Sequence, residues 1–122
     1  MTSSTDQLLS TADRLLSGAP AAMAVGRHRG VAFALRSALE RAISDRLLAG
    51  PPQIRVRSMR ARLLCLRVCA DTETARRARA VWALLCLGCH YHHYELGPTE
   101  EQLLSWRDEV AAIVMALETS TR

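Results

Sequence analysis

Residues 31–48 read Val-Ala-Phe-Ala-Leu-Arg-Ser-Ala-Leu-Glu-Arg-Ala-Ile-Ser-Asp-Arg-Leu-Leu and carry a clear helical pattern. Apolar residues return every three or four positions, as they do on one face of an α-helix. That face consists of Val31, Leu35, Ala38, Leu39, Ala42, Ile43 and Leu47. The pattern weakens toward residue 21, near Gly26 and Gly30, and Gly50-Pro51-Pro52 ends it. The sequence therefore predicts a long helix over residues 21–49.

The same periodicity predicts four further helices, over residues 4–17, 58–70, 71–90 and 99–118. Two of them begin with capping-box patterns, Ser4-x-x-Gln7 and Thr99-x-x-Gln102. Asp71-Thr72-Glu73-Thr74 supplies an N-cap for a third. Residues 54–57 alternate in polarity and fit an extended segment before Ser58. The residues expected to face inward are Leu8, Leu9, Ala12, Leu15 and Leu16, then Val56, Met59, Leu63, Leu66 and Ala70, then Ala78, Val81, Trp82, Leu85 and Cys89, and finally Leu103, Trp106, Val110, Val114 and Leu117.

The connections between these helices are short, and no strand or internal repeat is evident. This predicts an all-α fold, a single-domain up-down bundle of four or five helices over residues 1–122. With 49% hydrophobic and 23% charged residues, a chain of 122 residues is expected to fold around one core. Every helix carries an apolar stripe, and together these stripes have more apolar surface than one small core can bury. We therefore expect a homodimer.

Charge is unevenly distributed along the chain. All 16 basic residues are arginines, residues 27–79 carry a net charge of +9, and residues 80–122 carry −4. Guanidinium groups bind phosphate oxygens in pairs, so the basic middle suits RNA, another polyanion, or the acidic face of a protein partner or second copy. The candidate residues are Arg60 and Arg67, which share a helical face, and Arg76, Arg77 and Arg79 near the next helix start, where cations oppose the helix dipole. The alternative is a solvated surface, with Asp71 and Glu73 as internal counter-charges.

Residues 86–95, Cys-Leu-Gly-Cys-His-Tyr-His-His-Tyr-Glu, hold three of the four histidines and two of the four cysteines. Cys65-x3-Cys69 and Cys86-x2-Cys89 have the spacing of a structural zinc site, although both pairs lie in apolar runs that favour buried, metal-free thiols. Cys86-x-x-Cys89-His90 matches the c-type haem pattern, and Cys89 and His93 have the spacing of a nucleophilic pair on a helix. A His-rich helix end is also explained by its favourable interaction with the helix dipole. No cofactor is expected.

Residues 80–118 resemble the C-terminal part of HEPN domains. The resemblance rests on His92-x-Tyr94-Glu95-Leu96, followed by Gly97-Pro98-Thr99 and a last amphipathic helix. It implies a small helical bundle that dimerises. Many members of the family are metal-independent ribonucleases of toxin–antitoxin and phage-defence systems. In them a motif Arg and a His from two protomers meet at the dimer interface. The resemblance places His92 in the role of the catalytic His, with His90 as the alternative.

The family's motif Arg is missing from this chain. For His92, its place falls at Leu87, Cys86 or Leu85. Without that cation, nothing fixed stabilises the charge that develops during attack by a ribose 2′-OH. We therefore expect a non-catalytic HEPN-like module that binds RNA or a protein partner. The alternatives are a metal-independent ribonuclease using His92 with an Arg from elsewhere in the fold, and a zinc-binding helical protein.

The beginning of the chain lacks a basic segment followed by an apolar run, and no window approaches the roughly 18 apolar residues that span a bilayer. A cytoplasmic protein with no membrane contact is therefore expected, with its cysteines reduced.

Overall fold

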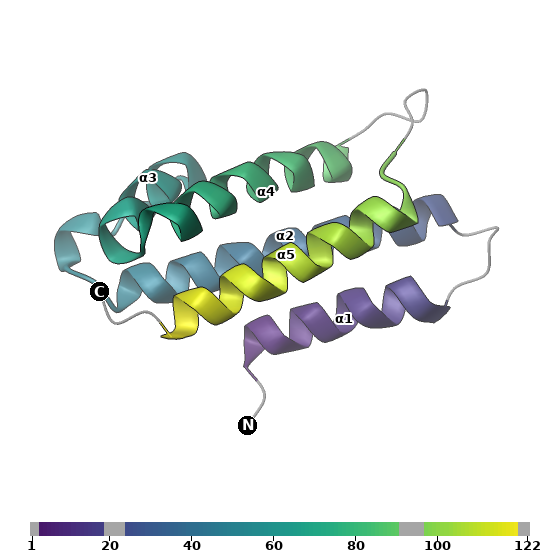
Figure 1. Cartoon of the computed structure of the whole chain (residues 1–122), viewed down its shortest axis with the longest axis horizontal. Helices are drawn as coiled ribbons and strands as arrows, with labels where there is room; N and C mark the ends of the chain where they lie inside the picture. The colour runs from purple at the N-terminus through teal and green to yellow at the C-terminus, as the bar shows by residue number, and fades with distance from the viewer. Residues whose placement is uncertain (1–2, 19–23, 91–96, 120–122) are drawn as a thin grey trace.

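The computed structural model describes residues 3–18, 24–90 and 97–119. These residues form five α-helices and no strand (Figure 1). The helices are α1 (Ser4–Gly18), α2 (Ala24–Leu48), α3 (Met59–Cys69), α4 (Thr72–His90) and α5 (Glu100–Thr119), and a short 3-10 turn, η2 (Pro52–Ile54), lies between α2 and α3. The predicted all-helical class and the predicted helices are confirmed.

Helix α2 lies at the centre of the bundle and packs against each of the other four helices (Figure 1). All seven residues of its predicted stripe are buried, and five of them, Val31, Leu35, Ala38, Leu39 and Ile43, have no exposed surface. Ala32 and Ala34, outside that stripe, are buried as well. The apolar face of α2 is therefore wider than one stripe, because the helix has neighbours on several sides.

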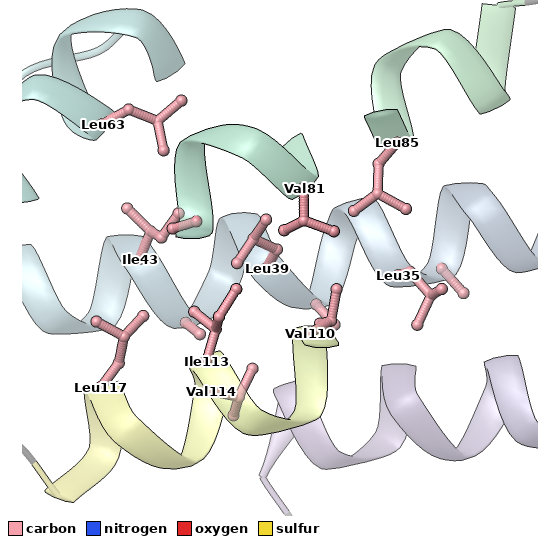
Figure 2. Close-up of a cluster of buried hydrophobic side chains, with 14 of the residues drawn as sticks. Leu35, Leu39, Ile43, Leu63, Val81, Leu85, Val110, Ile113, Val114 and Leu117 are labelled. Atoms are coloured by element: carbon pink, nitrogen blue, oxygen red, sulfur yellow. The ribbon is translucent and has the colours of Figure 1, made fainter. Parts of the chain in front are cut away.

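The core fills the space between α2, α4 and α5, where Leu35, Leu39 and Ile43 meet Val81, Leu85 and Val110 (Figure 2). The predicted inward faces of the other helices are buried, except for partly buried residues such as Leu8, Leu9, Leu15, Met59, Trp82 and Trp106. Ile113 was not among the expected core residues but is fully buried, one turn after Val110.

The helix caps largely follow the predicted pattern. The Thr99 amide donates to Gln102 Oε1 over 2.9 Å, and the Gln102 amide donates to Thr99 Oγ1 over 3.1 Å, which is the expected capping box. At the start of α1 the box is shifted by one residue: the Asp6 amide donates to Ser3 Oγ over 3.0 Å and the Ser3 amide to Asp6 Oδ2 over 3.4 Å. The predicted Ser4–Gln7 pair was therefore wrong by one position, since Ser3 and Asp6 have the same chemistry and spacing.

One arginine of α3 bonds both to the preceding linker and to α2. Ser58 caps α3, and its hydroxyl accepts the Ala61 amide over 3.1 Å. Within α3, Arg62 donates from Nε to the Val56 carbonyl over 3.0 Å and from Nη1 to Ser44 Oγ over 3.1 Å. Arg62 thus joins the linker, α2 and α3, and this fixes the side of α2 on which α3 lies.

Gly88 allows α4 to approach α2 and α5 closely. A Cβ atom at this position would lie 3.0 Å from Trp106 Cζ3 and 3.3 Å from the Ala32 Cβ. Both neighbours belong to other helices, so no side chain at residue 88 avoids them. At Gly26, by contrast, a Cβ atom would meet nothing within 4 Å.

Replacing these two glycines by leucine should have different effects on stability. Gly88→Leu overpacks the contact between α4, α2 and α5 and is expected to lower the free energy of unfolding by about 1–3 kcal/mol. Gly26→Leu adds a good helix former in open space and is expected to be neutral or stabilising by less than about 1 kcal/mol. Urea unfolding followed by circular dichroism measures both. Equal unfolding free energies for the two variants would contradict this packing.

Candidate nucleic-acid interface

Helices α3 and α4 enclose two adjoining surface hollows of about 210 and 430 Å³. Leu63, Leu64 and Arg79 line both hollows, so together they form one continuous groove, here called the arginine groove. Its lining consists of Arg60, Leu63, Leu64, Arg67, Thr72, Ala75, Arg76, Arg79, Trp82 and Ala83. The groove therefore has an apolar floor and four arginines around it.

Four of the five arginines proposed from the sequence line this groove. Arg60 and Arg67 come from α3, and Arg76 and Arg79 come from α4. Arg60, Arg67 and Arg79 are exposed, and within the described part of the chain none of them forms a hydrogen bond or ion pair. Three guanidinium groups that have no partner among the described residues thus line one groove.

Arg76 has a counter-charge, as the solvated-surface alternative expected. Its Nε and Nη2 atoms donate to the two carboxylate oxygens of Glu73, over 3.1 and 2.6 Å. The hydrogen bonds from Arg76 lower the pKa of Glu73. Both side chains are 60% exposed, so water and salt weaken the pair. Asp71 instead caps α4, because its Oδ2 accepts the Thr74 amide over 3.0 Å.

The structure gives Arg77 a different role from the one expected. Arg77 donates from Nε to Glu109 Oε2 over 3.0 Å and from Nη2 to Glu109 Oε1, which joins α4 to α5. The hydrogen bonds from Arg77 lower the pKa of Glu109. Arg77 is therefore bound to the acidic C-terminal helix and does not line the arginine groove. Its partner lies 32 residues away in the sequence, which is beyond the reach of helical periodicity.

One arginine that the sequence did not single out lies behind the groove. The guanidinium carbon of Arg36, on α2, lies 4.9 Å from the centre of the Trp82 ring, which is the geometry of a cation–π contact. The Nε atom of Arg36 is buried and has no hydrogen-bond partner in the ranges that the structure describes. Arg36 therefore adds a further positive charge beside the one aromatic side chain of the groove.

The four cysteines do not come together. Cys69 ends α3 beside the start of α4, whereas Cys86 and Cys89 lie in the last turns of α4. At 1.5 Å per residue, the distance along α4 from Thr72 to Cys86 is about 21 Å. Among the residues that the structure describes, no three or more His, Cys, Asp or Glu side chains form a group that could hold a metal ion. A zinc site of Cys65, Cys69, Cys86 and Cys89 is not assembled in this fold.

Cys89 is also poorly suited to be a nucleophile. Burial raises the pKa of its thiol, and the positive charges of Arg36 and Arg29 oppose that effect only in part. The reactive thiolate form is therefore disfavoured. The neighbouring Gly88 is packed against Trp106 and Ala32. Within Cys86-x-x-Cys89-His90, Gly88 and Cys89 thus lie in the packing of α4 against its neighbours, whereas Leu87 is exposed.

The candidate histidines can be placed only in part. His92 and His93 lie outside the described residues, and so does the loop of the HEPN-like pattern, residues 91–96. His90 is the last residue of α4, and only its backbone is described. Leu87, at the position of the family's motif Arg, is 71% exposed on α4.

Comparison with known proteins finds no matching family model, no similar curated protein and no similar solved structure. The HEPN relationship therefore stays a hypothesis that rests on residues 80–118. None of the helices in the described ranges is long and apolar enough to cross a membrane.

The Arg77–Glu109 pair should stabilise the fold measurably, unlike the exposed Arg76–Glu73 pair. Both Arg77 and Glu109 are about one-third exposed, at 35% and 33%, and their contact is bidentate. A double-mutant cycle with Arg77→Ala and Glu109→Ala is expected to give a coupling free energy of about 0.5–1 kcal/mol. Arg76→Ala is the matched control and should leave the unfolding midpoint unchanged. A cycle with no coupling would show that α4 and α5 do not depend on this ion pair.

The same pair predicts a pH dependence of stability. The pKa of Glu109 is lower in the folded chain than in the unfolded chain. The unfolded state therefore binds the proton more readily, and acid favours unfolding. The stabilisation is fully present at neutral pH and is lost as the pH falls through the lowered pKa of Glu109. In the Glu109→Gln variant, the loss of stability between neutral and acidic pH should be smaller than in the wild type.

Proposed function

We propose that this chain is a non-catalytic helical module that binds RNA through the arginine groove and acts as a homodimer. The observation that carries the proposal is the set of exposed guanidinium groups of Arg60, Arg67 and Arg79, which lack partners among the described residues and line one groove. Isolated positive charges gathered on one surface repel each other, and an anion placed between them removes that repulsion.

The shape and chemistry of the groove suit a phosphate backbone. Thr72, the first residue of α4, lines it, so the N-terminus of α4, which Asp71 caps, lies at one end. Arg76 and Arg79 follow that terminus on the same helix, and a phosphate bound between them offsets their positive charges. Trp82 is the only aromatic side chain in the groove. We therefore expect binding to single-stranded RNA with little base specificity, dominated by charge.

One observation favours a second candidate function, a metal-independent ribonuclease that uses His92. The motif Arg is absent, but Arg29 and Arg36 from α2 lie close enough to Cys89 for their charges to affect its pKa. Cys89 immediately precedes the His-rich segment. Arginines of α2 thus lie near the end of α4. RNA cleavage without divalent metal, abolished in His92→Ala, would support this candidate over the non-catalytic module.

The salt dependence of RNA binding tests the arginine groove. Each phosphate contact on a single strand contributes about −0.7 to the slope of log K against log salt. The double variant Arg67→Ala/Arg79→Ala is therefore expected to bind more weakly and to flatten the slope by about 1.4. The matched control is Arg14→Ala/Arg41→Ala, which removes two exposed arginines from α1 and α2 and should leave the slope unchanged.

Fluorescence anisotropy with a labelled RNA oligonucleotide measures these slopes. An equal loss in both double variants would mean that net charge, not the groove, attracts RNA. If the wild type binds no RNA but binds an acidic polypeptide tightly, the partner of the groove is a protein and the RNA proposal is wrong.

A further inference from the structure

Helix α4 exposes an apolar stripe that adjoins the arginine groove and shares Ala83 with it. The stripe consists of Ala80, Ala83, Leu84 and Leu87, which follow the spacing of one helical face. All four are exposed, and Leu84 and Leu87 keep 43% and 71% of their surface in contact with solvent. From Ala80 to the end of α4 at His90 the sequence contains no Asp, Glu, Lys or Arg. An outer helix face without charges over three turns is unusual for a surface that stays in water.

The exposed apolar residues of α5 have charged neighbours. On α5, Leu104 and Met115 are 47% and 68% exposed, but Asp108 lies one turn after Leu104 and Glu118 almost one turn after Met115. Such single apolar residues among charges are normal on protein surfaces. The α4 stripe differs from these α5 residues because its apolar residues are contiguous.

The order of residues in the stripe makes it complementary to itself. If two copies of α4 pack antiparallel about a two-fold axis between Ala83 and Leu84, Ala80 lies opposite Leu87 of the second copy, and Ala83 lies opposite Leu84. Every small side chain then faces a large one. Small residues let the two backbones approach, and the leucines fill the space that remains.

Charge also favours this arrangement. Antiparallel packing brings Arg76 and Arg79, near the N-terminus of one α4, toward the C-terminal end of the other. The carbonyl groups at a helix C-terminus carry partial negative charge, so cations there are stabilising. No charged side chain lies within the stripe itself, so no charge is buried without a partner.

We propose that the α4 stripe is the interface of a two-fold symmetric homodimer, and that the dimer joins two arginine grooves into one surface. In this antiparallel pair the two-fold axis is perpendicular to both α4 helices and lies in the plane that separates them. Rotation about this axis leaves the α3 helices of the two copies on the same side of the α4 pair. Both grooves therefore open on that side, one at each end. The joined surface, unlike the interface, rests on the proposed function. On it the RNA contacts eight arginines instead of four, namely two each of Arg60, Arg67, Arg76 and Arg79.

The oligomeric state tests the interface without RNA. Sedimentation equilibrium of the wild type at about 50 μM is expected to give the mass of two chains. Leu84→Glu/Leu87→Glu places four like charges at the interface and should give a single chain. Since both side chains are exposed, its helical circular dichroism should match the wild type. Leu104→Glu/Met115→Glu is the matched control on α5 and should stay dimeric. A monomeric wild type, or a dimer that survives Leu84→Glu/Leu87→Glu, would overturn the interface.

Disulfide cross-linking tests the antiparallel register. In a Cys65→Ser/Cys86→Ser background, which removes the two half-exposed thiols, Ala80→Cys/Leu87→Cys should form a covalent dimer on mild oxidation. Ala80→Cys alone should not, because an antiparallel pair separates the two copies of residue 80 by about 10 Å along the helices. Cross-linking by Ala80→Cys alone would instead indicate parallel helices and overturn the proposed register.

RNA binding tests the joined surface separately. The monomeric Leu84→Glu/Leu87→Glu variant keeps all its arginines, so its salt slope should fall to about half of the wild-type slope. An unchanged slope would show that each groove binds on its own and would refute the joined surface. A wild-type dimer that binds no RNA would support the interface but refute the proposed function.

Discussion

The fold depends on the burial of α2 on several sides. A helix that contacts four others needs apolar residues around most of its circumference, and small ones where the neighbours come closest. Ala32, Ala34, Ala38 and Ala42 are all buried in α2, between larger side chains such as Leu35 and Leu39. Because apolar burial contributes roughly 25 cal/mol per Å², this one helix holds a large part of the hydrophobic stabilisation. The positions of the other helices follow from the faces that α2 offers them.

The candidate site is a consequence of that packing. Arg62 attaches α3 to α2 through Ser44, while Trp82 of α4 stacks on Arg36 of α2. Both α3 and α4 are thus fixed to the same central helix, and the arginines on their outer faces meet across a groove. The acidic residues are used elsewhere: Glu109 binds Arg77, and Asp13 of α1 binds Arg107 of α5 over 2.7 and 2.9 Å. These ion pairs join neighbouring helices, and the carboxylates near the arginine groove among the described residues are Glu73, which binds Arg76, and Asp71, which caps α4.

Features set by local spacing could be predicted from the sequence, and features set by contacts between distant residues could not. Helix ends, caps and inward faces depend on neighbours within a few positions, so Ser58, Thr99 and the α2 stripe behave as expected. Arg60 and Arg67 share a helical face because they are seven positions apart, and this too depends only on local spacing. Arg77 is different, because helical spacing places it beside Arg76 but only the fold brings Glu109 to it. Periodicity also misses the α4 stripe: this helix is apolar on its inner and outer faces, and one sequence pattern cannot tell which face is covered.

The central claim is that the groove between α3 and α4 is the surface that binds RNA. The two tryptophans of the chain allow a direct test, since Trp82 lines the groove and Trp106 packs against Gly88 on another side of α4. Single-stranded RNA can be titrated into the ¹⁵N-labelled protein while the two indole N–H resonances are followed by NMR. The resonance of Trp82 is expected to shift progressively with added RNA, and that of Trp106 to stay in place. A shift of Trp106 alone, or of neither resonance at RNA concentrations where binding is saturated, would contradict the account.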